Sequence, residues 1–212
     1  MTLKPMSKFM EYLCKGIFWL VFILGYGAKV HHRDRVPKEG AFIVAPNHTS
    51  NFDPPLLGMA MNRPVYLMAK EELFKNPIFG KIITEMGAFP LRRGTVDKVA
   101  IRNAMSILKR GDLLGIFPQG TRAKEGTFEG FHDGMASLAL RTGVPIIPVT
   151  IIGSSKMKRN GIHIIVGEPI PVEKDKPTKE AIEGVNEKVQ AIMRATYFEE
   201  SKRYGLVFSE EA

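Results

Sequence analysis

Residues 41–53 read Ala-Phe-Ile-Val-Ala-Pro-Asn-His-Thr-Ser-Asn-Phe-Asp, and this stretch decides the fold. The apolar run Ala41–Ala45 predicts a buried strand, because a strand covered on both faces reads as a continuous hydrophobic segment. A polar turn follows. Pro54 and Pro55 then open a helix that we expect to reach about Met61, since proline is tolerated in the first helical turn. Strand, turn and helix in succession form the repeating unit of an α/β protein.

The same alternation continues along the rest of the chain. Further strands are predicted at Lys29–Arg35, Val65–Ala69, Ala88–Leu91, Asp112–Phe117, Val144–Ile152 and Ile162–Val166. Further helices are predicted at Ile78–Met86, at Val96–Lys109 with Thr95 as its cap, at Met135–Thr142 and at Thr178–Phe198. We therefore expect one α/β domain over residues 31–200, with a mixed sheet covered by helices on both faces. Residues 201–212 are predicted to be a loosely ordered tail.

Composition and charge narrow the class of protein. Of the 212 residues 44% are hydrophobic and 25% are charged, which is typical of a globular chain. The single cysteine, Cys14, cannot form an internal disulfide, which favours a reducing compartment. The net charge of +8 favours anionic partners such as a lipid surface or a phosphorylated substrate. Nucleic acid is not an expected partner, because the chain lacks zinc-finger ligands, a basic helix and aromatic-rich strands.

Residues 16–28, Gly-Ile-Phe-Trp-Leu-Val-Phe-Ile-Leu-Gly-Tyr-Gly-Ala, form an uncharged apolar run that follows three lysines. The run is shorter than the roughly 20 residues that a membrane-spanning helix needs. We expect residues 1–30 to form a membrane-anchoring helix in one leaflet, with Tyr12, Trp19 and Tyr26 near the headgroups. A cleaved signal peptide and a buried core helix are the alternatives. The expected location is the cell membrane, in a peripheral or monotopic arrangement that faces the cytoplasm.

His48 and Asp53 are the candidate reactive pair. They stand five positions apart across a tight turn, where their side chains can meet. A histidine can take a proton from a hydroxyl group, and a carboxylate can hold the imidazole in the required tautomer. The alternative is structural, with Asp53 as a helix N-cap and His48 as a polar turn residue.

Four segments together resemble the glycerophosphate and lysophosphatidate acyltransferase family. They occur in the order in which the family has them, and the resemblance covers about residues 35–170. The segments are Asn47-His48-Thr49-Ser50-Asn51-Phe52-Asp53, Gly87-Ala88-Phe89-Pro90-Leu91-Arg92-Arg93, Phe117-Pro118-Gln119-Gly120-Thr121-Arg122 and Val144-Pro145-Ile146-Ile147-Pro148-Val149.

The resemblance implies a role for each motif. His48 would be the general base of an acyl transfer, and Asp53 would orient it. Arg93, with Arg92 beside it, would hold the phosphate of the acceptor. Gln119, Gly120, Thr121 and Arg122 would form a second substrate-binding turn that faces an anion. The family usually has glutamate at the position of Gln119, which puts the identity of the acceptor and the rate in question.

The implied enzyme is a 1-acylglycerol-3-phosphate O-acyltransferase. It would move an acyl group from acyl-CoA or acyl carrier protein to the sn-2 hydroxyl of lysophosphatidate, without a further cofactor. Another lysophospholipid or lipid acceptor, or a non-catalytic membrane lipid-binding protein, are alternatives. A lipid-ester hydrolase is a weaker alternative, because the chain has no Gly-x-Ser-x-Gly nucleophile segment. No metal is expected, because the five histidines show no recurrent ligand spacing.

Overall fold

The computed structural model describes residues 8–92, 94 and 96–206, and seven strands form one sheet in this part of the chain. Their spatial order is β1-β7-β6-β2-β5-β3-β4. All neighbouring strands run parallel except β6 and β7, which are antiparallel, so the predicted mixed sheet is confirmed. The strands are β1 Lys29–His31, β2 Phe42–Pro46, β3 Val65–Lys70, β4 Ala88–Leu91, β5 Leu113–Gly115, β6 Ile146–Ile152 and β7 His163–Val166.

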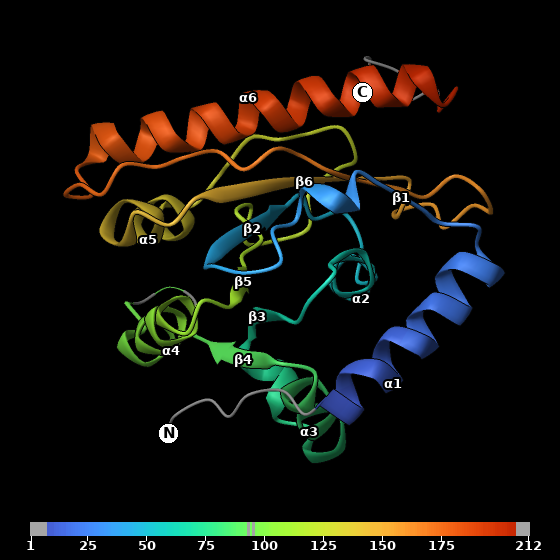
Figure 1. The fold of residues 1–212 in the computed structure, drawn as a ribbon, viewed down its shortest axis with the longest axis horizontal. Helices are drawn as coiled ribbons and strands as arrows, with labels where there is room; N and C mark the ends of the chain where they lie inside the picture. Colours follow the sequence, from blue (N-terminus) through green and yellow to red (C-terminus); the bar gives the residue numbers. More distant parts are fainter. Residues whose placement is uncertain (1–7, 93, 95, 207–212) are drawn as a thin grey trace.

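Helices lie on both faces of this sheet, as predicted (Figure 1). The first, α1, continues directly into a π-helical segment at Trp19–Gly25. Short 3₁₀ turns occur at Arg33–Arg35 and Glu71–Phe74. The α-helices are α1 Lys8–Phe18, α2 Asp53–Ala60, α3 Pro77–Glu85, α4 Lys98–Lys109, α5 Asp133–Thr142 and α6 Lys179–Arg203.

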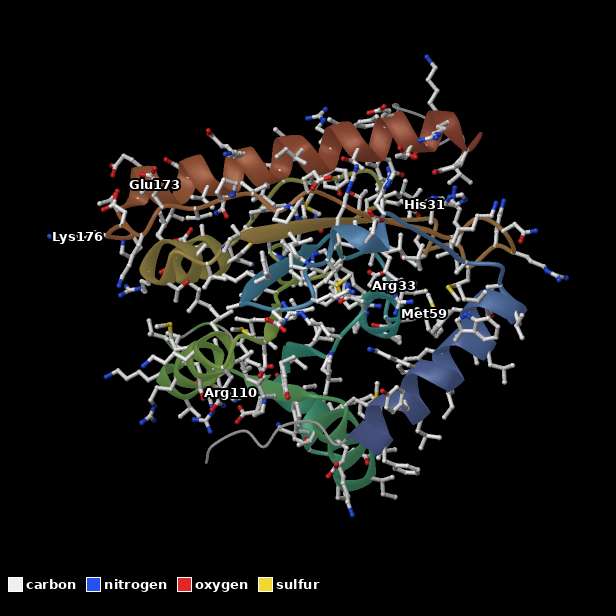
Figure 2. The ribbon with its side chains drawn as sticks, in the orientation of Figure 1. His31, Arg33, Met59, Arg110, Glu173 and Lys176 are labelled. Carbon is white, nitrogen blue, oxygen red and sulfur yellow. The ribbon has the colours of Figure 1, made fainter. Side chains whose placement is uncertain are left out.

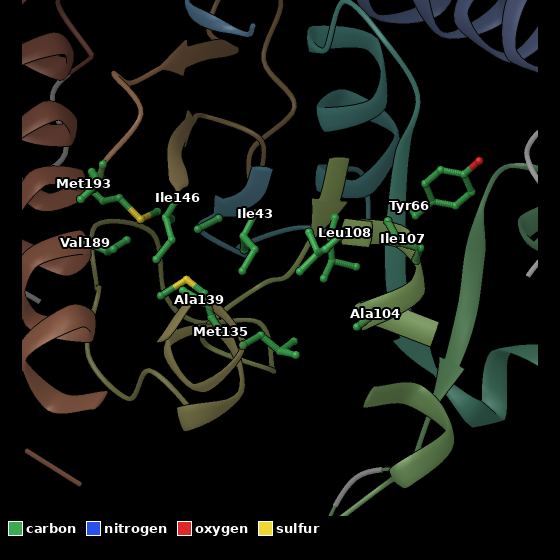
Figure 3. Close-up of a cluster of buried hydrophobic side chains, with 14 of the residues drawn as sticks. Ile43, Tyr66, Ala104, Ile107, Leu108, Met135, Ala139, Ile146, Val189 and Met193 are labelled. Carbon is green, nitrogen blue, oxygen red and sulfur yellow. The ribbon is translucent and has the colours of Figure 1, made fainter. Parts of the chain in front are cut away.

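The core has two parts because successive side chains of a strand point to opposite faces. Ile43 of β2 belongs to the cluster beneath α4, α5 and α6, which Figure 3 shows in close-up. The next residue, Val44, belongs to the cluster beneath α2 and the π-helical segment. Strand β2 is therefore buried on both faces, which explains why its sequence is continuously apolar.

The start of α6 and the end of α5 agree with the prediction, whereas the start of α4 does not. Thr178 caps α6 by accepting a hydrogen bond from the N–H of Ala181, and Gly143 ends α5 in a left-handed conformation. Helix α4 starts at Lys98, two residues later than predicted, because the carboxylate of Asp97 accepts the N–H groups of Val99 and Ala100. The predicted cap, Thr95, lies outside the described residues.

Two further boundaries were predicted wrongly. The strand expected at Lys29–Arg35 ends at His31, because His32 adopts a left-handed conformation with φ 58° and turns the chain. The tail was expected to start at residue 201, but residues 201–203 belong to α6, which ends at Arg203, and Ser201 is 5% exposed. Residues 207–212 of that predicted tail lie outside the described residues.

The N-terminal helix is buried on one side only. Phe22 is 3% exposed and packs into the cluster beneath α2, whereas Trp19, Leu20 and Leu24 are exposed. This differs from the buried core helix that was the alternative prediction. Among the described residues, no helix combines the length and the apolar character that crossing a membrane requires.

Candidate active site

The turn that follows β2 is held in place by its first residue, Asn47. The side-chain amide of Asn47 donates to the carbonyl of Ile151 at 2.9 Å, and its oxygen accepts the N–H of Ile151 at 2.7 Å. Asn47 is almost completely buried, so these two bonds fasten the turn to the neighbouring strand β6. The sequence did not predict this role for Asn47, because its partner Ile151 lies 104 positions further along the chain.

His48 and Asp53 meet across this turn. Nδ1 of His48 lies 2.9 Å from Oδ2 of Asp53, and the Asp53 side chain is fully buried. The imidazole ring also packs against the ring of Phe117, with centroids 4.4 Å apart. Within the described part of the chain, Nε2 of His48 has no hydrogen-bond partner. The pair therefore has the geometry of a base and its orienting carboxylate, with the second ring nitrogen available to a substrate.

The carboxylate of Asp53 accepts four hydrogen bonds. Besides His48, the N–H groups of Thr49 and Ser50 donate to Oδ2 at 2.6 and 2.7 Å. The hydroxyl of Ser154 donates to Oδ1 at 2.5 Å. The N-cap of α2 is Phe52, and Asp53 lies inside the first turn of the helix. The alternative prediction of Asp53 as a simple N-cap is therefore wrong, because its carboxylate binds the preceding turn and Ser154.

Ser154 is a site residue that the sequence analysis missed. It is completely buried, and its hydroxyl also lies 2.9 Å from the hydroxyl of Thr49. Glu125 fixes the segment around it by accepting hydrogen bonds from the N–H of Gly153 and the hydroxyl of Ser155. No local sequence signal marks Ser154, because it reaches Asp53 from 101 positions further along the chain.

Gln119 supports the backbone of His48. Its Oε1 accepts the N–H of His48 at 3.0 Å, and its Nε2 donates to the carbonyl of Thr127 at 2.9 Å. The residue is 4% exposed. Both polar atoms of the side chain thus bond to the protein backbone, and one of these bonds needs a donor that a carboxylate lacks.

The rest of the predicted anion-facing turn lies beside His48 as well. The N–H of Ala123 donates to the carbonyl of His48 at 2.9 Å, and the preceding residues Thr121 and Arg122 are exposed. Gly120 has a φ of 65°, and a Cβ there would meet the ring of His132 at 2.5 Å. Glycine is therefore required at this position both by conformation and by space.

Arg92 does not join this cluster. It follows β4 at the edge of the sheet, is largely exposed, and pairs with Glu71 through Nε at 2.9 Å. The hydrogen bond from Arg92 to Glu71 raises the pKa of the guanidinium group. Strands β5 and β3 separate β4 from β2, which corresponds to roughly 14 Å at the usual strand spacing. Arg93, the other predicted phosphate ligand, lies outside the described residues.

The described residues contain no group of three or more His, Cys, Asp or Glu side chains that is suited to hold a metal ion. Around His48, the 2.9 Å contact with Asp53 is supported by hydrogen bonds from three other segments: the β6 backbone, Ser154 and the Gln119–Ala123 loop.

Comparisons with known proteins agree on one family. A family model described as "Acyltransferase" matches residues 27–152. The chain is 29% identical over 162 residues to the 1-acyl-sn-glycerol-3-phosphate acyltransferase of Bacillus subtilis, covering 74% of this chain and 80% of the relative. It is 32% identical over 198 residues to the Streptococcus pneumoniae protein of the same name, covering 89% and 73%.

A solved structure matches as well. The crystal structure of the 1-acyl-sn-glycerophosphate (LPA) acyltransferase PlsC from Thermotoga maritima superposes with a TM-score of 0.71 at 26% identity. The superposition covers 96% of this chain and 81% of that one. The similarity therefore includes the N-terminal helix and α6, beyond the residues that the family model matches.

Proposed function

The chain belongs to the acyltransferase family, and from this premise we propose that it acylates the sn-2 hydroxyl of lysophosphatidate to give phosphatidate. The acyl donor is a thioester, either acyl-CoA or an acyl group carried on acyl carrier protein. The choice of acceptor is supported by the names of two relatives and of the solved structure, all of which are 1-acylglycerophosphate acyltransferases. The observation that carries the chemistry is the 2.9 Å contact of His48 Nδ1 with the buried carboxylate of Asp53.

The reaction is a direct transfer. Nε2 of His48 takes the proton of the acceptor hydroxyl as its oxygen attacks the thioester carbonyl carbon. The C–S bond then breaks, and the departing thiolate receives the proton from the imidazolium. Asp53 holds Nδ1–H throughout and stabilises the imidazolium that forms between the two proton transfers.

Two regions would receive the anionic parts of the substrates. Thr121 and Arg122 are exposed on the loop that is bonded to the His48 carbonyl, which suits an anionic group held close to the reacting hydroxyl. Arg93 follows Arg92 after the edge strand β4 and keeps its predicted role of holding the acceptor's phosphate, whereas Arg92 pairs with Glu71. The resemblance implied that Gln119 contacts the substrate. Here it instead positions His48 by accepting its backbone N–H, while its own amide donates to the carbonyl of Thr127.

Membrane lipid synthesis implies a membrane-associated enzyme. We place the chain at the membrane surface, facing the cytoplasm, with the N-terminal helix in one leaflet. The exposed apolar side of that helix supports this arrangement.

The test is a radiolabelled acyl-transfer assay with acyl-CoA and acyl carrier protein as donors. The acceptors are lysophosphatidate, lysophospholipids with larger headgroups, and a lyso-ornithine lipid. We expect lysophosphatidate to be acylated fastest, and His48→Ala to lower kcat by about 10²- to 10⁴-fold, the usual contribution of a general base. Unchanged transfer by His48→Ala would exclude the assigned base, and faster acylation of any other acceptor in the panel would exclude lysophosphatidate as the preferred acceptor.

A further inference from the structure

The outer side of the N-terminal helix is an apolar surface without a cover among the described residues. Phe22 fixes the inner side against the domain, while Tyr12, Ile17, Trp19, Leu20 and Leu24 are exposed. Soluble monomers rarely expose so many large apolar side chains on one face, so this surface is expected to have a partner.

A basic loop lies at the end of this helix. Residues 153–161 connect β6 to β7 and read Gly-Ser-Ser-Lys-Met-Lys-Arg-Asn-Gly, with three cations and no acid. The N–H of Asn160 donates to the carbonyl of Tyr26 at 2.7 Å, directly after the π-helical segment. Figure 1 shows this orange loop beside the upper end of the blue helix, although the bonded residues Tyr26 and Asn160 are 134 positions apart in sequence.

The backbone conformation of the loop directs its apolar side chain inward and leaves its charged side chains exposed. Met157 has a φ of 46° and packs against the buried cluster that contains Phe22. Asn160 has a φ of 60°, and between these two left-handed residues Lys158 and Arg159 are exposed. The loop is therefore anchored by Met157 and exposes Lys158 and Arg159 beside the end of the helix at Tyr26.

We propose that the helix and this loop form one docking surface for a membrane leaflet that contains anionic phospholipid. The apolar side chains of the helix enter the boundary between headgroups and acyl chains, and Lys158 and Arg159 bind headgroup phosphates. Charge complementarity selects this occupant: a nucleic acid would leave the apolar side chains in water, whereas an anionic leaflet accommodates both parts of the surface. The inference rests on the membrane placement proposed above, adds the loop as its charged part, and does not depend on the acyl-transfer reaction.

The experiment measures binding of the full chain to vesicles, with no turnover involved. The vesicles are made of phosphatidylcholine alone or of phosphatidylcholine with phosphatidylglycerol. We expect tighter binding to the anionic vesicles, with an advantage that declines as salt screens the charges. In Lys158→Gln/Arg159→Gln, affinity for the anionic vesicles falls about thirtyfold, because each cation near such a surface contributes about fivefold. Binding to neutral vesicles stays unchanged.

Two further variants control the result. Lys176→Gln/Lys179→Gln removes the same charge near the start of α6, and Figure 2 shows Lys176 at the end of the molecule away from α1. This control should lose far less affinity. Leu20→Gln/Leu24→Gln should weaken binding to both kinds of vesicle, and circular dichroism confirms that each variant is folded.

Three outcomes would overturn the proposal. The first is equal binding of the wild type to neutral and anionic vesicles. The second is equal loss in Lys158→Gln/Arg159→Gln and in its charge control. The third is unchanged binding of Lys158→Gln/Arg159→Gln to the anionic vesicles. If a separate acyl-transfer assay of that variant then gives a raised KM for acyl carrier protein, the loop is assigned to an acidic protein instead.

Discussion

Phe22 and Phe52 contact each other edge to face, with ring centroids 6.0 Å apart and an interplanar angle of 69°. Phe22 belongs to the π-helical continuation of α1, and Phe52 directly precedes Asp53 in the active turn. The N-terminal helix is thereby packed against the turn that carries His48. A helix that attaches the protein to a membrane would hold the reacting imidazole close to the lipid surface.

This contact predicts an energetic coupling between helix and turn. In a double-mutant cycle with Phe22→Ala and Phe52→Ala, we expect a coupling of about 1 kcal/mol in the free energy of unfolding, measured by urea denaturation. A parallel cycle of Tyr12→Ala with Phe52→Ala is the control, because the exposed Tyr12 has no ring contact with Phe52. Additive effects in the first cycle would show that the two rings contribute independently.

Gln119→Glu should destabilise the protein, although it restores the residue that the family usually has. A carboxylate cannot donate to the carbonyl of Thr127, and its charge would be buried against that oxygen. We expect the free energy of unfolding to fall by about 1–3 kcal/mol near neutral pH. The loss should be smaller near pH ~4, because burial raises the pKa of the introduced carboxyl and its protonated form can donate.

Gln119→Met is the matched variant, since it keeps the volume but loses both hydrogen bonds without adding charge. Its destabilisation should not vary with pH. If Gln119→Glu is as stable as the wild type over this pH range, the amide is not required behind His48.

Ser154→Ala tests the fourth hydrogen bond of the Asp53 carboxylate. Loss of the 2.5 Å contact leaves Oδ1 without this donor and loosens the orientation of the pair. We expect kcat to fall about tenfold, which corresponds to a hydrogen bond to a charged group of about 1.4 kcal/mol, with the KM of the acceptor unchanged. Steady-state acyl-transfer kinetics measure both constants.

Ser155→Ala is the control for that variant. Its hydroxyl is exposed and donates to Glu125 instead of Asp53, and the N–H of Gly153 still bonds to Glu125 in this variant, so kcat should change little. A change in KM alone for Ser154→Ala would mean that Ser154 shapes the acceptor site and does not position Asp53.

The pair His31 and His163 should make the free energy of unfolding depend on pH, independently of catalysis. Their rings stack with centroids 5.2 Å apart, His31 Nε2 lies 3.1 Å from His163 Nδ1, and the hydroxyl of Tyr204 lies 3.1 Å from His31 Nδ1. Burial lowers the pKa of both imidazoles from the ordinary 6.5. For His163 the neighbouring His31 lowers it further, and for His31 the carboxylate of Glu200 partly offsets the effect.

Because the folded state disfavours protonation of these rings, the unfolded state takes up protons first as pH falls. The free energy of unfolding should therefore decrease from about pH 6.5 downward, as urea denaturation at a series of pH values would show. His163→Phe should make this dependence shallower, whereas Tyr204→Phe should leave it in place. An unchanged slope in His163→Phe would assign the acid sensitivity to other groups.

The sequence by itself determined the strand–turn–helix unit and, to within two residues, most element boundaries. Strand β2 is apolar at every position because both of its faces are covered, and Pro54 and Pro55 mark the start of α2. Thr178 starts α6 through a hydrogen bond, and Gly143 ends α5 through its left-handed conformation; both depend only on a few neighbouring residues. The meeting of His48 and Asp53 was also predictable, since five residues across a tight turn leave little freedom.

Only the tertiary structure decided what surrounds that pair. Asn47 bonds to Ile151, Gln119 to His48 and Ser154 to Asp53, and these partners are 104, 71 and 101 positions apart. Such contacts depend on the order of strands in the sheet, which brings β2 between β6 and β5. Local periodicity and turn chemistry carry no information about that order. For the same reason the sequence showed the apolar helix but not the basic loop, residues 153–161, that lies at its end.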